Sequence, residues 1–182
     1  MSAPLFLLQL AGAPGTGKSK LAAAIARARP AAIVNSDVVK STLLDAGIAW
    51  SQAGPAAYQV LFALADDLLA QGHSVILDSP SHYDHIPENG QRVARERGVP
   101  YRFLELVCPD LGELKRRLAK RTPRRSQMRG LDEPPPDSDR PSQAKRIGLH
   151  QWATRPADGF LVLDTSQSFE AYVAQALAFL DS

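Results

Sequence analysis

Residues 12–19 have the sequence Gly12-Ala13-Pro14-Gly15-Thr16-Gly17-Lys18-Ser19, which fits every fixed position of the phosphate-loop pattern G-x-x-x-x-G-K-[ST]. The flanking segments fit as well, because an apolar run at 5–10 predicts a buried strand and an Ala-rich run at 21–29 predicts a helix. The pattern requires a strand, a glycine loop and a helix in this order. The stretch therefore predicts that the chain binds a nucleoside triphosphate.

Each residue type in this loop has a physical task. The glycines let the backbone turn so that successive N–H groups point at phosphate oxygens, and the following helix adds the positive end of its dipole. Lys18 can reach the β- and γ-phosphates, and the hydroxyl of Ser19 can bind Mg²⁺. We expect all of residues 12–19 to bind the nucleotide, with Lys18 also taking part in catalysis.

The composition is that of an ordinary globular domain. Of the 182 residues, 45% are hydrophobic and 22% are charged, and the net charge is +2, which argues against a disordered chain or a membrane protein. The start of the chain carries no basic leader, and the apolar run that follows is too short to span a membrane. The single cysteine, Cys108, excludes an internal disulfide. We expect one soluble cytoplasmic domain over 1–182 with no membrane partner, and the sequence does not indicate its oligomeric state.

Strand-like and helix-like segments alternate along the rest of the chain, which predicts an α/β fold. We expect a three-layer α/β/α P-loop NTPase fold, in which helices cover both faces of a mainly parallel sheet. Further strands are predicted at 31–35, 74–78, 101–108 and 160–164, and further helices at 38–46, 55–71, 86–97, 111–121 and 169–180.

Basic charge gathers between residues 115 and 146, where eleven basic residues face four acidic ones. Five prolines between 122 and 142 exclude a continuous helix there and predict an irregular segment. We therefore expect an Arg-rich lid at about 115–142, although a basic stretch can also be only a solvated surface. Arg117, Arg121 and Arg125 are the candidates for binding the nucleotide phosphates, and Arg121 is our choice for a catalytic role. Arg117 and Arg121 are four residues apart and should share a helical face.

Asp37 lies at the exit of the predicted strand at 31–35, two residues after its end. Ligands of open α/β sheets bind at the carboxyl ends of the strands, so this carboxylate should lie near Lys18. Phosphoryl transfer needs a group that accepts the proton of the attacking hydroxyl, and Asp37 is our candidate for this base. The alternative is that Asp37 caps the following helix, a task that Ser36 could also perform.

Asp78 ends the apolar run at 74–77, which is the pattern of a Walker B strand. Its carboxylate and the hydroxyl of Ser19 are therefore the candidate ligands of Mg²⁺. Ser79 follows, in place of the glutamate that polarises water in many motor ATPases, so water is not the expected acceptor. His82 and His85 have a spacing that could suit a metal, but we expect Ser79 and His82 to line an acceptor pocket.

In these motifs the chain resembles the small P-loop kinases of the zeta-toxin, chloramphenicol phosphotransferase and polynucleotide 5′-kinase type, often catalogued as AAA-like ATP-binding domains. The resemblance rests on the phosphate loop, on Asn35-Ser36-Asp37, on residues 72–78 and on the Arg-rich lid. It implies that Asp37 activates the acceptor hydroxyl and that lid arginines cover the phosphates of ATP. Polynucleotide kinases of this type carry an arginine three residues after the acid, where this chain has Lys40, which binds phosphate without a bidentate fork.

The sequence thus predicts an ATP-dependent phosphotransferase that uses ATP and Mg²⁺. The favoured acceptor is a hydroxyl of a small molecule, held near Asp37, Lys40, Ser79 and His82. A kinase that acts on the 5′-hydroxyl end of a nucleic acid is an alternative. An ATPase and a noncatalytic nucleotide-binding module are further alternatives. A GTP-dependent switch is disfavoured because the chain has no Asn-Lys-x-Asp sequence.

Overall fold

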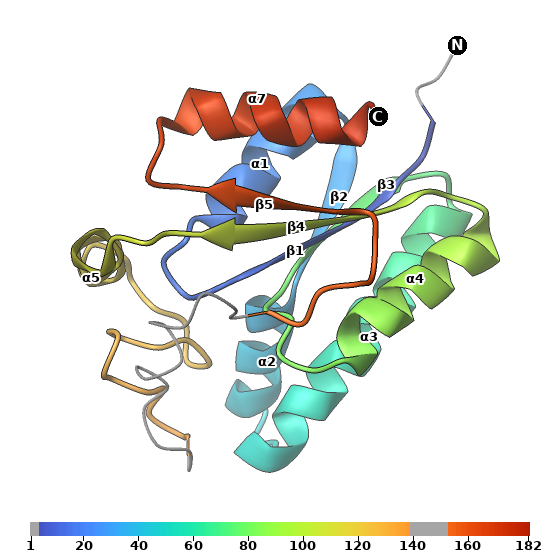
Figure 1. Cartoon of the computed structure of the whole chain (residues 1–182). Helices are drawn as coiled ribbons and strands as arrows, with labels where there is room; N and C mark the ends of the chain where they lie inside the picture. Colours follow the sequence, from blue (N-terminus) through green and yellow to red (C-terminus); the bar gives the residue numbers. More distant parts are fainter. Residues whose placement is uncertain (1–3, 139–152) are drawn as a thin grey trace.

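Five parallel strands form one sheet in the computed structural model, which describes residues 4–138 and 153–182 (Figure 1). The strand order is β2-β3-β1-β4-β5, and every neighbouring pair is parallel. Because parallel strands need crossover connections, helices cover both faces of such a sheet. The strands are β1 Leu7–Gly12, β2 Ala31–Asn35, β3 Ser74–Asp78, β4 Tyr101–Val107 and β5 Phe160–Asp164.

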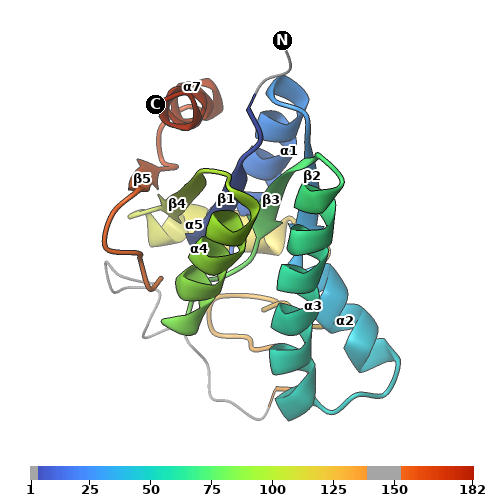
Figure 2. The ribbon, with the colours of Figure 1, turned by 90° about the vertical axis from the view of Figure 1, so that its right-hand side faces the viewer.

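Helices α1 and α7 cover one face of the sheet, and α3 and α4 cover the other (Figures 1 and 2). The predicted three-layer α/β/α fold is therefore confirmed. None of the helices in the described residues is long and apolar enough to cross a lipid bilayer. The helices are α1 Lys18–Ala28, α2 Ser36–Asp45, α3 Trp50–Ala70, α4 His85–Arg97, α5 Leu111–Ala119 and α7 Phe169–Leu180.

Strand β1 is buried along its whole length because it lies in the middle of the sheet. Its side chains alternate between the two faces, as the pleat requires. Leu8 and Leu10 pack into the core beneath α1 and α7, whereas Leu7 packs into the core beneath α3 and α4. Both cores end at the carboxyl edge of the sheet, where polar residues follow the strands.

Several helices differ from the prediction at their ends, and the differences at α3 and α5 bear on the site. Helix α3 begins at Trp50, five residues early, and contains Pro55. The missing N–H of this proline removes only one helical hydrogen bond, and Trp50 is held by Lys40, whose ammonium lies 3.4 Å from the centre of the indole ring. Helix α5 ends at Ala119, so Arg121 does not lie on it. The expectation that Arg117 and Arg121 share a helical face was therefore wrong.

Residues 120–138, called here the arginine segment, form neither helix nor strand, as the prolines predict. The predicted lid at 115–142 thus begins within α5 and continues through this segment, while its last residues, 139–142, lie outside the described residues. Arg140, Lys145 and Arg146 of the basic cluster lie outside them too.

A substitution at Gly12 tests how closely the backbone of the phosphate loop approaches the neighbouring strand β4. In Gly12→Ala the new Cβ would lie 2.2 Å from the carbonyl oxygen of Leu106, at a φ of +129°. We expect this variant to lose about 3 kcal/mol of unfolding free energy, measured by urea denaturation. Gly47→Ala is the control, because Gly47 has a φ of +86° but no atom within 4 Å, and it should lose only about 1 kcal/mol. Equal losses would contradict the close approach at Gly12.

Candidate active site

Four parts of the chain meet at the carboxyl edge of the sheet. The phosphate loop, residues 12–19, connects β1 to α1, and α2 follows β2 directly. Asp78 is the last residue of β3, and the arginine segment follows α5. This edge is where ligands bind in open α/β sheets.

The phosphate loop is wound by three glycines with positive φ, Gly12, Gly15 and Gly17. The ammonium of Lys18 lies inside this turn, where Nζ donates to the carbonyl oxygens of Gly12 at 2.7 Å and Ala13 at 3.1 Å. Burial lowers the pKa of Lys18, and the carboxylates of two aspartates, Asp78 and Asp37, oppose this shift. A cation held in this turn is suited to meet phosphate oxygens.

The carboxylate of Asp78 is buried and hydrogen-bonded from two sides. Its Oδ2 accepts from the hydroxyl of Ser19 at 2.5 Å and from Nδ2 of Asn35 at 2.6 Å. Burial raises the pKa of Asp78, and the charge of Lys18 and the bond from Ser19 act against that rise. Ser19 and Asp78 thus present two neighbouring hard oxygen atoms, the donor type that Mg²⁺ prefers.

In the part of the chain that the structure describes, no three His, Cys, Asp or Glu side chains gather into a metal site. This finding covers His82 and His85, whose spacing left a metal site open in the sequence. It does not disfavour Mg²⁺ at Ser19 and Asp78, because Mg²⁺ usually takes one or two carboxylates and completes its shell with water and substrate phosphates.

The cap of helix α2 is Asn35. Its Oδ1 accepts from the backbone N–H groups of Asp37 at 2.9 Å and Val38 at 3.1 Å. The alternative that Asp37 or Ser36 caps this helix is therefore wrong, and the Ser36 hydroxyl instead donates to the carbonyl oxygen of Asp78 at 3.4 Å. The carboxylate of Asp37 remains available for other contacts.

These other contacts come from the arginine segment. Gln127 donates from Nε2 to Oδ2 of Asp37 at 2.7 Å, and the Ser126 hydroxyl lies 3.4 Å from Oδ1. Ser126 also bonds to Ser41 of α2, with Oγ atoms 2.9 Å apart. The arginine segment therefore lies directly over the start of α2.

Arg121 is the predicted arginine that the structure brings to Lys18 and Asp37. Burial lowers the pKa of Arg121, and the charge of Asp37 opposes the shift. The Arg121 guanidinium also lowers the pKa of Lys18. Nη2 of Arg121 donates to the carbonyl oxygen of Met128, while its buried Nε has no hydrogen-bond partner among the described residues. A cation so placed near Lys18 can meet a phosphate.

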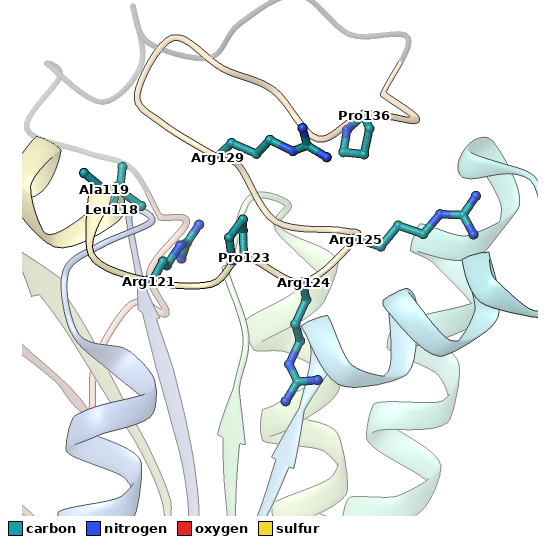
Figure 3. Close-up of a pocket in the computed structure, with 8 residues that line it drawn as sticks. All are labelled: Leu118, Ala119, Arg121, Pro123, Arg124, Arg125, Arg129 and Pro136. Atoms are coloured by element: carbon teal, nitrogen blue, oxygen red, sulfur yellow. The ribbon is translucent and has the colours of Figure 1, made fainter.

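The other two predicted arginines are engaged elsewhere. Arg117 donates to the carbonyl oxygen of Thr165 at 2.8 Å and to Glu113 at 2.8 Å, which ties α5 to the end of β5. Arg125 donates to Asp137 at 2.7 Å and to the carbonyl oxygen of Leu44 at 2.8 Å. Figure 3 shows Arg125 extending toward α2, apart from Arg121. Among the described residues, the hydrogen bonds of both side chains go to groups outside the phosphate loop.

A cavity of about 450 Å³ opens between the end of α5 and the arginine segment. Figure 3 shows its walls, among which the guanidinium groups are the main charged groups. Such a lining is suited to anions. The residues that line it are Leu118, Ala119, Arg121, Pro123, Arg124, Arg125, Arg129 and Pro136.

The predicted acceptor residues have different surroundings. Lys40 stacks on the Trp50 ring, as described above. Ser79 is buried, and its hydroxyl has no hydrogen-bond partner among the described residues. His82 is half-buried and meets Tyr83 edge to face, with the ring centres 6.5 Å apart. Ser79 is thus the one of these three that lies in the interior beside Asp78.

Three residues of this site did not emerge from the sequence: Asn35, Ser126 and Gln127. Asn35 carried a usable signal, because an asparagine between a strand and a helix favours a cap. Nothing in the sequence places Gln127 on Asp37, since the two residues are joined only by the path of an irregular segment.

Comparison with known proteins gives a family and a fold. A model of the family described as AAA domain matches residues 7–134. Uncharacterised proteins of Mycobacterium tuberculosis and Mycobacterium bovis are 37% identical over 84 residues, which is 40% of this chain and 17% of each relative. The match therefore spans less than a fifth of the length of these relatives.

Solved structures share the fold at low identity. A sugar kinase from Janibacter sp. has a TM-score of 0.67 and 20% identity, covering 98% of this chain and 95% of its own. A candidate kinase from Chloroflexus aurantiacus has a TM-score of 0.73 and 22% identity, with coverage of 97% and 98%. The APS kinase CysC of Mycobacterium tuberculosis, in complex with AMPPNP and APS, has a TM-score of 0.66 and 19% identity, with coverage of 98% and 99%.

The capping role of Asn35 can be measured directly. Asn35→Ala removes the acceptor for two backbone N–H groups of α2 and a donor to Asp78, so it should lower the unfolding free energy by about 2 kcal/mol. Ser36→Ala should lower it by less than about 0.5 kcal/mol, because its single bond is long. Both values come from urea denaturation, and a larger loss in Ser36→Ala would contradict the assignment.

Proposed function

Because this chain belongs to the AAA domain family, we propose that it is an ATP-dependent phosphotransferase that moves the γ-phosphoryl group of ATP to a hydroxyl of a small molecule. The observation that carries this proposal is the position of the Asp37 carboxylate. Asn35 caps α2 in its place, and the Asp37 carboxylate lies close enough to Lys18 for the two charges to interact. A carboxylate beside a phosphate loop is suited to accept the proton of an attacking hydroxyl.

The phosphate loop and α1 hold the phosphates. Backbone N–H groups of residues 12–19 and the positive end of the α1 dipole bind the phosphate oxygens, and Lys18 neutralises charge on the β- and γ-phosphates. Ser19 and Asp78 would hold Mg²⁺, which adds positive charge at the same phosphates when it is bound.

Transfer then needs one bond to form and one to break. The acceptor oxygen forms a bond to the γ-phosphorus, the bond from that phosphorus to the β–γ bridging oxygen breaks, and ADP leaves. The proton of the acceptor hydroxyl passes to the carboxylate of Asp37. Arg121, half-buried near Lys18 and Asp37, stabilises the negative charge of the transferred group.

Two observations support a small molecule as the acceptor. Solved structures with this fold include a sugar kinase and an APS kinase. Several arginines in and beside the arginine segment are also neutralised by acidic side chains, because Arg116 and Arg117 pair with Glu113, and Arg125 pairs with Asp137. A polynucleotide acceptor would instead need several basic side chains available for backbone phosphates.

The base is tested by Asp37→Asn, which keeps the shape and loses the proton acceptor. With an acceptor found by screening sugars, nucleosides, antibiotics and 5′-hydroxyl oligonucleotides for ADP release, kcat should fall about 10²- to 10⁴-fold. The affinity for Mg·ATP, measured by calorimetry, should stay within about threefold, since Asp37 contacts no phosphate in this scheme. Unchanged kcat would remove Asp37 from the reaction, and ADP release independent of every acceptor would favour an ATPase.

The phosphate loop is tested by Lys18→Ala. This change removes the charge that neutralises the β- and γ-phosphates, so Mg·ATP should bind at least about tenfold more weakly and transfer should fall below detection. Lys20→Ala is the matched control two residues further along α1, because the ammonium of Lys20 lies over the Phe169 ring at 3.8 Å. Near-normal turnover in Lys18→Ala would contradict the whole proposal.

A further inference from the structure

The carboxylate of Asp37 receives a hydrogen bond from a side chain that has no part in the reaction derived above. Gln127 of the arginine segment donates from Nε2 to Oδ2 of Asp37 at 2.7 Å, and the two residues are 90 positions apart in the chain. A donor on a catalytic base either holds the base in place or blocks it. The contacts around Gln127 and Asp37 distinguish these two roles.

The side-chain amide of Gln127 is itself held in one orientation. Its Oε1 accepts from the backbone N–H of Arg124 at 3.1 Å, and the backbone N–H of Gln127 donates to the carbonyl oxygen of Arg124 at 2.9 Å. Because the amide oxygen is used within this turn, the amide nitrogen is the group that faces Asp37. Residues 124–127 thus form a turn that presents one N–H group to the carboxylate.

Both neighbours of Gln127 in the chain are fastened to other parts of the protein. The carbonyl oxygen of Met128, the next residue, accepts from Nη2 of Arg121. The backbone N–H of Ser126, the preceding residue, donates to Oγ of Ser41 in α2 at 3.1 Å. The position of the Gln127 side chain is therefore set from the phosphate-binding side and from the α2 side.

The contact with Gln127 leaves the other oxygen of the carboxylate able to accept a proton. Among the described residues, Oδ1 of Asp37 has only a long contact, 3.4 Å from the hydroxyl of Ser126. A bond of this length is weak, and a carboxylate oxygen has two lone pairs. Oδ2 is thus held while Oδ1 can meet an acceptor hydroxyl, which favours positioning over blocking.

Resting on the proposed function, we propose that Gln127 is a positioning residue, whose N–H group holds Oδ2 of Asp37 so that Oδ1 faces the acceptor hydroxyl. Asp37 is half-buried in the first turn of α2, where its side chain without this bond could take several rotamers. A misplacement of about 1 Å can cost about 10²-fold in rate. Since Arg121 belongs to the same segment, the groups that stabilise the transferred phosphoryl and orient the base come into place together.

The role is tested by Gln127→Ala, which removes the N–H group. The acceptor is one found by the screen described above, and water, followed as ADP release from Mg·ATP alone, is a second acceptor. The kcat should fall about tenfold, while KM for Mg·ATP and for the acceptor stays within about threefold, because Gln127 contacts neither in this scheme. In an Asp37→Asn background, Gln127→Ala should lower kcat no further, since it acts through Asp37.

Two further variants serve as controls. Gln127→Glu keeps the size of the side chain and an oxygen for the N–H of Arg124 but has no N–H group, so its kcat should fall at least as far as in Gln127→Ala. A residue that only fills space would tolerate this change. Gln71→Ala is the matched control, because Nε2 of Gln71 donates to Oδ2 of Asp67 at the same 2.7 Å, away from the site, and its kcat should not change.

The contact can also be measured without any reaction. The Tm of the free protein is compared in Asp37→Ala, Gln127→Ala and the double variant. A shared hydrogen bond makes the Tm loss of the double variant smaller than the sum of the two single losses, by about 3 °C. Additive losses would show that the two side chains do not interact, and would overturn the inference.

The outcomes separate this inference from the proposed function. A kcat that falls in Asp37→Asn and stays unchanged in Gln127→Ala overturns the positioning role and leaves the phosphotransferase standing. A higher kcat in Gln127→Ala also overturns it, because Gln127 would then block the base. Absence of ADP release from the wild-type chain with every acceptor contradicts the phosphotransferase, and a non-additive Tm loss then upholds the contact alone.

Discussion

The carboxylate of Asp78 lies at the end of a central strand, where a buried charge without partners would cost several kcal/mol. It is stabilised by hydrogen bonds from Ser19 and Asn35 and by the charge of Lys18. Ser19 and Lys18 belong to the phosphate loop, and Asn35 ends β2, so satisfying this one charge fixes the phosphate loop against β3 and the start of α2. The positions of the remaining site residues depend on this arrangement.

The cap at the start of α2 also determines where the carboxylate of Asp37 lies. Since Asn35 provides the cap, Asp37 can turn its carboxylate toward the arginine segment, where Gln127 and Ser126 meet it. Arg125 fastens the same segment to the end of α2 through the carbonyl oxygen of Leu44. The segment is therefore attached to both ends of one short helix, and Arg121 is brought beside Lys18 and Asp37 as a result.

Much of this fold could be predicted from the sequence because its signals are local. The strands at 31–35 and 160–164 were predicted to the residue, since apolar runs between turn residues mark buried strands. The helix ends were less accurate, because Pro55 and the basic run to Arg121 suggest boundaries that tertiary contacts override. The contact of Gln127 with Asp37 was not predictable either, since only the path of an irregular segment brings these two residues together.

The two ends of the Asn35 side chain perform different tasks, and this limits how the position can vary in evolution. Its oxygen accepts from the α2 backbone and its nitrogen donates to Asp78. Aspartate and serine could cap the helix, but aspartate would place a second negative charge against Asp78, and the serine hydroxyl would have to serve both partners from one atom. Glutamine has both groups on a longer arm that fits a cap poorly. Mutational drift at residue 35 would thus require a compensating change at the end of β3, so the two positions should change together or not at all.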